Sequence, residues 1–323
     1  MQSILTVAIP TFNRIDAAQK TLKSLSPIFN QPQVKILVID NGSTDGTYPT
    51  LQESFPSVHN LEILRFEDNL GFFESFLRLF ENANSDYLLL LSDEDEVNLV
   101  ELPALLRYLQ IKKPGYISSQ FFKDGQLYRG NHLTQSISLL DLEKSSFYIS
   151  GLVFNVSKSQ KITLKMRDGL KANPFILLYP QTYLALMLKI SDGGYWLESI
   201  LASKRDNLPT SVVDARQESY TSKSSRISQH FGWEEMVKKI ISDERDKLSR
   251  RDIFVIKCFT RLRENSLRVD FTGIPDGTFL RSNFSSRMFT CIMSAGLLIP
   301  RKIFWRLYRL LRQIKITIFC FRR

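Results

Sequence analysis

The segment with the clearest potential for chemistry is a run of four consecutive acids, Asp93 to Glu96, which Ser92 separates from the apolar run Tyr87–Leu91. Adjacent carboxylates repel one another unless a cation or solvent separates them. Carboxylate oxygens are the ligands that hard divalent ions such as Mg2+ or Mn2+ prefer. The acids therefore predict a divalent-cation site. The alternative is a solvated acidic turn, because charge runs are usually exposed.

Two further polar turns follow apolar, strand-like segments. Pro10–Arg14 comes after Ile4–Ile9, and Asp40–Gly46 comes after Val34–Ile39. In an open α/β sheet, ligands bind at the carboxyl ends of the strands, so we expect these turns and the acids at one edge, where a nucleotide would bind. Asp40 can accept hydrogen bonds from a ribose hydroxyl or a base N–H. It is equally typical of a turn before Asn-Gly.

Apolar periodicity places these turns on an α/β framework. We expect strands over Ile4–Ile9, Val34–Ile39, Leu61–Phe66, Tyr87–Leu91, Tyr116–Phe122, Phe147–Asn155 and Tyr195–Ala202. Helical patterns cover Asp16–Leu25, a short stretch that ends at about Ser54, Phe72–Phe80 and Leu99–Leu109. Strands that alternate with helices favour a parallel sheet with right-handed crossovers. The expected fold class is α/β: a Rossmann-like open, mostly parallel sheet with flanking helices, plus a helical C-terminal region.

The sequence also predicts a division of the chain. We place a nucleotide-binding and catalytic domain at residues 1–230 and a helical C-terminal region at residues 231–323. Asp214–Phe231 is polar and serine-rich and is predicted as a loop, whereas Trp233–Ser249 and Arg251–Leu267 have helical patterns. Oligomeric state is left open.

Composition describes an ordinary globular protein of 323 residues, with 43% hydrophobic and 24% charged residues. Its three cysteines are widely spaced, which favours a reducing compartment without disulfides or a zinc site. The N-terminus leads directly into a strand-like segment, so we expect no signal peptide and a cytoplasmic location.

The net charge of +10 is concentrated at the C-terminus, because Gly277–Arg323 holds ten Lys and Arg residues and no Asp or Glu. Phe289–Ile299 is too short to span a bilayer, which needs about 20 apolar residues. From Ile303 to Ile314, apolar residues recur at helical spacing, with basic residues mostly off that stripe. We expect an in-plane helix on an anionic membrane surface, or else a helix docked on protein. Charge confined to one tail argues against a nucleic-acid-binding protein.

Four motifs together resemble the family 2 glycosyltransferases of GT-A fold, of the bacterial polysaccharide or O-antigen type. They are Ile9–Arg14, Val38–Thr47, Asn69–Gly71 and Leu91–Asp95, and the resemblance covers roughly Leu5 to Leu201. It implies an inverting transfer of a sugar from a nucleotide-diphosphate donor. The acceptor would be a glycan or a polyprenyl-linked saccharide. The enzyme would then work on the inner face of the cell membrane, to which the tail would attach it peripherally.

The resemblance also implies roles for individual residues. Pro10, Thr11 and Phe12 would line the base and ribose pocket, Asp40 would hold the base or ribose, and Asn69 and Gly71 would shape the floor beside the diphosphate. Asp93, Glu94 and Asp95 would form the Asp-x-Asp motif that holds Mn2+ or Mg2+. Two registers stay open: Asp93 and Asp95 act as a pair, or Asp93 meets the ribose and Glu94 the metal. Arg14 would reach a phosphate, or else be an exposed residue of the first turn.

The general base departs from the family pattern. The family places a Glu-Asp pair at the start of a helix, where this chain has Pro180 and Gln181, and glutamine cannot act as a base. Asp192 lies at the far end of the same predicted helix, and His132 is an isolated histidine. Both are candidates, and the sequence leaves the base unidentified.

Two alternatives to sugar transfer share the same predicted sheet edge. One is a nucleotide-sugar-binding protein without transferase activity. The other is a nucleotidyltransferase, which should carry a loop rich in glycine and basic residues after the first strand. Pro10–Asp16 has no such loop, and it also lacks the spaced glycines of an NAD or FAD site.

Overall fold

The computed structural model describes residues 3–123, 126–129, 136–205, 222–257 and 260. Its contacts divide the chain into two units, Met1–Ser249 and Arg250–Arg323. The expected boundary at residues 230/231 falls inside helix α9 (Lys223–Asp243), which belongs to the first unit. In the second unit, residues 250–257 are helical. His132 and the basic tail lie outside the described residues.

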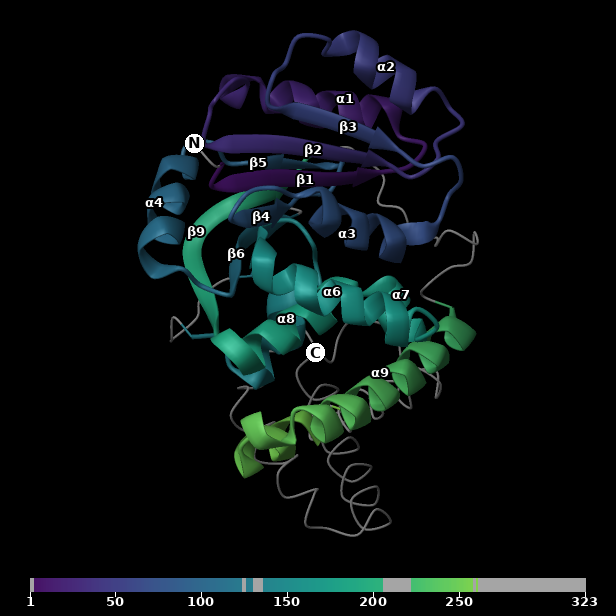
Figure 1. The fold of residues 1–323 in the computed structure, drawn as a ribbon, viewed down its shortest axis with the longest axis vertical. Helices are drawn as coiled ribbons and strands as arrows, with labels where there is room; N and C mark the ends of the chain where they lie inside the picture. The colour runs from purple at the N-terminus through teal and green to yellow at the C-terminus, as the bar shows by residue number, and fades with distance from the viewer. Residues whose placement is uncertain (1–2, 124–125, 130–135, 206–221, 258–259, 261–323) are drawn as a thin grey trace, which may run out of the picture. The chain divides into compact units, whose positions relative to one another are not determined.

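The first unit is built on a sheet in which nine strands are described, in the order β3-β2-β1-β4-β8-β6-β9-β5, with β7 paired to β6 (Figure 1). The first four strands, all parallel, are β1 (Leu5–Thr11), β2 (Val34–Asp40), β3 (Leu61–Arg65) and β4 (Tyr87–Leu90). β2, β3 and β4 each follow a helical connection, as expected for right-handed crossovers. The carboxyl ends of β1, β2 and β4 therefore meet at one edge.

The second half of the sheet is mixed. β8 (Leu152–Asn155) runs antiparallel to β4 and to β6 (Tyr116–Lys123), whereas β9 (Gly194–Lys204) is parallel to β6. Two short strands, β5 (Asp95–Val97) and β7 (Gln126–Arg129), complete the sheet. The prediction of an α/β fold with an open, mostly parallel sheet is confirmed.

Helices cover both faces of the sheet (Figure 1). The helices of the described part of the first unit are α1 (Ile15–Ser24), α2 (Thr47–Ser54), α3 (Gly71–Asn82), α4 (Leu102–Lys112), α5 (Leu142–Ser146), α6 (Val156–Leu170), α7 (Pro174–Leu178), α8 (Pro180–Asp192) and α9, which packs on α7 rather than on the sheet. Successive strand residues point to opposite faces. On one face Val7 and Leu89 pack with Leu22 of α1, and on the other Phe80 of α3 meets Phe154 of β8 edge to face, with ring centroids 5.8 Å apart.

Two predicted elements were wrong. Only Leu152–Asn155 of the expected strand Phe147–Asn155 is a strand, because the chain bends at Gly151, whose φ of 81° places it in the left-handed region. The expected loop at Asp214–Phe231 is helical from Lys223 onward. There the Ser222 side chain caps α9 by accepting a hydrogen bond from the Ser225 backbone N–H. Serine content indicated a loop, whereas one of these serines begins a helix.

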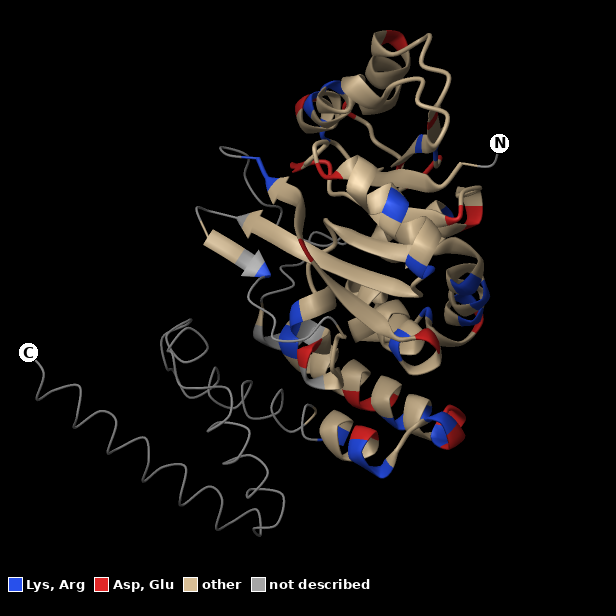
Figure 2. Ribbon diagram, turned by 90° about the vertical axis from the view of Figure 1, so that its left-hand side faces the viewer, with Lys and Arg blue, Asp and Glu red and all other residues tan. Residues whose placement is uncertain are grey.

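Charge is distributed as a buried sheet requires. Figure 2 shows that the described strands are mostly uncharged and that Lys, Arg, Asp and Glu gather on the helices and at strand ends. In the part of the chain that the structure describes, no helix combines the length and apolar character needed to cross a bilayer.

Candidate active site

The sheet brings the predicted polar turns together at the carboxyl ends of its central strands. Thr11, the last residue of β1, pairs in register with Asp40, the last residue of β2. The Thr11 hydroxyl also donates a hydrogen bond of 2.7 Å to Asp93 Oδ2, in the turn that follows β4. Residues from three separate motifs thus meet within one hydrogen-bonded group.

The acidic turn is buried. Asp93 is 4% exposed, Glu94 6% and Asp95 0%, which excludes the solvated acidic turn that was the alternative prediction. Carboxylates removed from water require partners that replace hydration. The hydrogen-bond and ion-pair partners of these three acids therefore indicate the role of each carboxylate.

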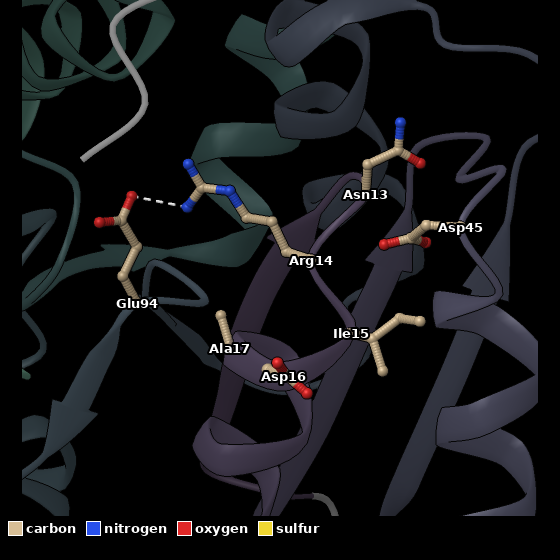
Figure 3. A pocket seen from close by; sticks show the side chains of 7 residues that line it. All are labelled: Asn13, Arg14, Ile15, Asp16, Ala17, Asp45 and Glu94. Atoms are coloured by element: carbon tan, nitrogen blue, oxygen red, sulfur yellow. Dashed lines mark hydrogen bonds and ion pairs between the residues drawn. The ribbon is translucent and has the colours of Figure 1, made fainter. Parts of the chain in front are cut away.

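Asp93 and Glu94 share one cation. Arg14, at the N-cap of α1, places Nη1 at 3.0 Å from Asp93 Oδ1. The same nitrogen lies 2.6 Å from Glu94 Oε1, the contact drawn in Figure 3. Burial lowers the pKa of Arg14, but the charges of Asp93 and Glu94 outweigh that effect and raise it above its ordinary value. The Arg14 side chain is only 23% exposed, so it is not the exposed first-turn residue of the alternative reading.

Asp95 belongs to a different network. It is the first residue of β5, and its carboxylate accepts hydrogen bonds from the hydroxyls of Ser150 and Tyr148. Burial raises the pKa of Asp95 to about 6, and these two hydrogen bonds oppose the rise. Burial, followed by the charge of Asp95, also raises the pKa of Tyr148. Asp95 thus has different partners from the two acids before it.

A cavity of about 390 Å³ lies beside the Arg14 guanidinium that Asp93 and Glu94 share. It is lined by Asn13, Arg14, Ile15, Asp16, Ala17, Asp45 and Glu94 (Figure 3). The lining comes from the start of α1, the turn after β2 and the acidic turn. Of the residues that we predicted to contact the donor or metal, Arg14 and Glu94 line this cavity, whereas Pro10, Thr11, Phe12, Asp40, Asn69, Gly71, Asp93 and Asp95 do not.

Sequence reasoning missed Asn13 and Asp45 as lining residues, although both stand in motifs it had singled out. Asn13 has a left-handed φ of 52°, and its Oδ1 accepts a 2.8 Å hydrogen bond from the Thr44 backbone N–H. In return, the Asn13 backbone N–H donates to Ser43 Oγ at 2.8 Å. These bonds fasten the turn after β1 to the turn after β2 and fix one wall of the cavity.

Asp40 is fully buried and is used by its own turn. Its Oδ1 accepts hydrogen bonds from the backbone N–H and the hydroxyl of Ser43, and Arg65 Nε lies 3.7 Å from its Oδ2. At that distance Arg65 and Asp40 form an ion pair, but the two atoms are too far apart for a hydrogen bond. Burial raises the pKa of Asp40, and the Ser43 bonds and Arg65 oppose the rise. This geometry is that of a turn-forming aspartate.

Asn69 and Gly71 shape the neighbouring turn. Asn69 Oδ1 accepts hydrogen bonds from Asn41 Nδ2 at 2.7 Å and from the Gly71 backbone N–H at 2.9 Å. The two turns touch at Gly42, which has a φ of 76°; a Cβ there would lie 2.4 Å from the carbonyl carbon of Asp68. Only glycine allows this approach. Phe12, in the turn after β1, is 37% exposed.

The position where the family has its base holds a structural glutamine. Pro180 is the first residue of α8, as predicted, and Gln181 is 1% exposed. Its Nε2 donates a 2.9 Å hydrogen bond to the Phe147 carbonyl, and its Oε1 has no hydrogen-bond partner among the described residues. Asp192, at the other end of α8, pairs with Lys158 of α6.

Arg205, which no motif indicated, braces the acidic turn from behind. Its guanidinium donates to the Asp95 carbonyl at 3.3 Å, to Thr21 Oγ1 at 3.0 Å and to Glu96 Oε1 at 2.8 Å. Thr21 in turn donates to the Asp93 carbonyl at 2.7 Å. The backbone of the turn is therefore held by Arg205, which follows β9, and by Thr21 of α1, independently of its carboxylates.

The donor atoms suit a divalent cation, although no three His, Cys, Asp or Glu side chains within the described residues form a ready metal group. Asp93 and Glu94 provide carboxylate oxygens, the ligands that Mg2+ and Mn2+ prefer. Glu94 Oε2 is buried and has no hydrogen-bond partner among the described residues. The two carboxylates therefore fit a metal, with Arg14 at present in contact with both.

Comparisons with known proteins agree with this geometry. The model of the family described as glycosyl transferase family 2 matches residues 6–168, about half of the chain. Among curated proteins, the uncharacterized glycosyltransferase MG060 of Mycoplasma genitalium is 24% identical over 125 residues, which are 37% of this chain and 41% of that protein. The chain thus aligns with only about two fifths of that relative's length.

Solved structures show the same fold. TarS residues 1–349 of S. aureus has a TM-score of 0.60 at 15% identity, over 83% of this chain and 73% of that one. The same protein in complex with UDP-GlcNAc also has a TM-score of 0.60 at 15% identity, over 81% and 73%. The mannosyltransferase PcManGT from Pyrobaculum calidifontis, in complex with GDP-Man and Mn2+, has a TM-score of 0.51 at 11% identity, over 94% and 83%.

The fold is that of the GT-A glycosyltransferases. More specifically, the chain belongs to glycosyl transferase family 2. The resemblance inferred from the four motifs is confirmed.

Proposed function

We propose that this chain is an inverting glycosyltransferase that moves a sugar from a nucleoside-diphosphate donor to a glycan or a polyprenyl-linked saccharide. The observation that carries the proposal is the group of Arg14, Asp93 and Glu94 beside the cavity, at the carboxyl ends of β1 and β4. Leaving-group departure from a nucleotide-sugar creates negative charge on a diphosphate. A site that concentrates cations at this point stabilises that charge as it develops.

In the proposed arrangement, each turn of the sheet edge has one task. Pro10, Thr11 and Phe12 would line the nucleoside pocket, where the exposed Phe12 ring offers a face for stacking. Asp40 would contact the base or ribose, and Asp93 the ribose and the cation together with Glu94. A bound Mn2+ or Mg2+ would act as a Lewis acid on the diphosphate.

The remaining residues of the site would position the others. Arg14 would add positive charge next to the phosphates, and Asn69 and Gly71 would shape the floor beside them. Asp95 would hold the start of β5 through Ser150 and Tyr148, rather than bind the cation, because both of its oxygens are already hydrogen-bonded. The proposal therefore follows the second register, in which Asp93 meets the ribose and Glu94 the metal, and adds a contact of Asp93 with the cation.

The relatives support the donor class. TarS was solved with UDP-GlcNAc and with UDP, and PcManGT with GDP-Man and Mn2+. We extend to this chain the use of a nucleoside-diphosphate sugar, with UDP and GDP as the first nucleotides to try. Polysaccharide synthesis at the inner face of the membrane, through the basic tail, completes the proposal.

Binding of the donor without transfer is the second candidate, and the buried Gln181 favours it. An inverting transfer requires a base to take the acceptor proton. Gln181 occupies the family's base position, Asp192 is paired with Lys158, and His132 lies outside the described residues. Transfer therefore requires a base from elsewhere, whereas binding alone does not.

A thermal-shift panel of UDP-, GDP- and dTDP-sugars with and without Mn2+ tests the proposal first. A ligand at about 100 times its Kd should stabilise the folded state by about 2.7 kcal/mol. The responding donor is then incubated with candidate acceptors, and NMR of the product reads the anomeric configuration. Retention of configuration would refute the inverting mechanism, and binding without any product would favour the second candidate. Full activity of Asp93→Asn in EDTA would refute metal assistance at this turn.

A further inference from the structure

We propose that Arg14 is an internal counter-ion that a divalent cation displaces from the acidic turn, and that the displaced guanidinium then pairs with the donor diphosphate. The inference rests on the proposed function and extends it. It makes Arg14 a switch between two partners: the carboxylates in the free enzyme and the phosphates in the loaded enzyme.

The first support is that one nitrogen contacts both carboxylates. Arg14 Nη1 lies 3.0 Å from Asp93 Oδ1 and 2.6 Å from Glu94 Oε1. A cationic centre within bonding distance of two carboxylates is the arrangement that a divalent ion would also take. Two unit charges at about 4 Å still repel by several kcal/mol at the effective dielectric near a protein surface. Arg14 and a metal therefore compete for this place.

The second support is an oxygen that Arg14 leaves without a partner. Glu94 Oε2 is buried and accepts no hydrogen bond from any described residue. A buried carboxylate oxygen normally has a donor or a cation. The guanidinium thus satisfies the turn incompletely, and a divalent cation held by Asp93 and Glu94 would supply the missing partner.

The third support is the position of Arg14 itself. It stands at the entrance of α1, lines the cavity, and keeps 23% of its side chain exposed. Its guanidinium can therefore turn toward the cavity without leaving the protein surface. The turn does not depend on Arg14 for its backbone, because Thr21 and Arg205 hold the carbonyls of Asp93 and Asp95.

Charge balance gives the exchange a consequence. In the free enzyme, two carboxylates face one guanidinium and leave one negative charge. A divalent cation neutralises both carboxylates and frees the guanidinium for an anion. Binding of metal and diphosphate should therefore be cooperative beyond their direct contact, and linkage requires the coupling to be reciprocal.

Titration of MnCl2 into nucleotide-free protein, followed by the EPR signal of free Mn2+, tests the competition directly. We expect Arg14→Gln to bind Mn2+ at least about tenfold more tightly than wild type, whereas Arg14→Lys, which retains the charge, should stay within about threefold. Arg167→Gln is the matched control: Arg167 also bridges two carboxylates, Glu74 and Glu81, and its loss changes the net charge equally. Equal affinities of wild type and Arg14→Gln would overturn the proposal, as would an equal gain in Arg167→Gln.

A second titration measures the other partner. With saturating Mn2+, UDP or GDP should bind Arg14→Gln about tenfold more weakly than wild type, because the diphosphate lacks the guanidinium. Unchanged affinity of a nucleotide that binds would overturn the exchange. If neither nucleotide nor any donor sugar binds wild-type protein, the proposed function fails instead, and the metal titration still decides the competition.

A measurement on the wild-type chain guards against misfolded variants. The side-chain 15N resonances of Arg14 are followed by NMR while MgCl2 is added. Displacement should move them toward the values of a solvated arginine, while those of Arg167 stay unchanged. Arg14 resonances that do not respond at saturating metal would overturn the proposal.

Discussion

Replacing Gln181 by Glu tests whether the start of helix α8 could serve as the base position in this enzyme. The structure uses Gln181 as a buried link: its Nε2 donates to the Phe147 carbonyl at 2.9 Å and its side chain is excluded from solvent. A glutamate has the same shape but, when ionised, cannot donate. We therefore expect Gln181→Glu to cost stability without raising the transfer rate.

The magnitude follows from three contributions. Leaving the buried Phe147 carbonyl without its donor costs about 1–3 kcal/mol. An ionised carboxylate at a buried site adds a desolvation penalty, limited by protonation of the group. The positive N-terminal end of α8 offsets about 0.3–1 kcal/mol of this. Together these give an expected loss of about 2–4 kcal/mol in the free energy of unfolding at about pH 8.

The loss should depend on pH in a defined direction. Burial would raise the pKa of the new carboxyl above about 4.3, its value in the unfolded chain. Between these two pKa values the folded state holds a proton that the unfolded state has lost, so stability falls as pH rises through that range. Below it, the protonated carboxyl can donate to the Phe147 carbonyl and recover the bond. The variant should therefore approach wild-type stability at about pH 4.

Urea unfolding followed by circular dichroism at about pH 4, 6 and 8 measures this, with Gln181→Met as the control. Methionine removes the donor without adding a titrating group, so its smaller loss should not change with pH. The transfer rate is measured with the donor identified in the thermal-shift panel. A rise in rate of about tenfold or more in Gln181→Glu would show that α8 begins at the base position. Unchanged stability at about pH 8 would refute the buried-link account.

Three further predictions concern other residues of the chain. Asp40→Ala should weaken donor binding by about 10- to 100-fold through loss of a charged hydrogen bond, whereas Ser43→Ala, which removes the hydroxyl contacts with Asp40 and with the Asn13 N–H but keeps the Asp40 carboxylate, should weaken it less; equal effects on donor Kd would favour the turn role. Burial alone would raise the pKa of Asp192. The hydrogen bonds from Lys158 and Ser191 and the charge of Lys158 outweigh burial, so the pKa lies below 3.8. The stabilisation by ionised Asp192 is thus present above pH 3.8 and is lost as pH falls through the lowered pKa. Asp192→Asn should cost up to about 1 kcal/mol at neutral pH in urea unfolding and progressively less as pH falls below that range. The transfer rate should be unchanged unless Asp192 is the base. Truncation before Arg301 should abolish salt-sensitive binding to vesicles of anionic lipid in a sedimentation assay, and equal binding of both forms would refute the membrane role of the tail.

The sheet and its edge were predictable because two local signals agreed. The apolar runs that became β1, β2 and β4 end in polar residues, and parallel strands present their carboxyl ends together. Those rules identify which residues share an edge. They do not specify which way each side chain turns, and Asp40 shows the difference. The position of Asp40 at the sheet edge was predicted from the sequence. Its hydrogen bond with Ser43 and its ion pair with Arg65 depend on how the turns pack.

Residues that act at long range were beyond the sequence. Arg205 lies 110 positions from Asp95, and the bond between them depends on β9 lying next to β5. A lone arginine after a strand carries no motif. Ser150 and Tyr148 are a similar case, since the segment that contains them was predicted as a strand. Its bend at Gly151 accompanies their contacts with Asp95.

The acidic turn ends where strand β5 begins. Asp95 is the first residue of β5 and contacts Ser150, whereas Glu94 lies in the turn before that strand and faces Arg14 and the cavity. Asp93, held by Thr11 and Arg14, completes a pair with Glu94 that shares one cation. Three adjacent acids of nearly identical chemistry thus acquire two distinct environments, and only the pair beside the cavity is placed to exchange its counter-ion.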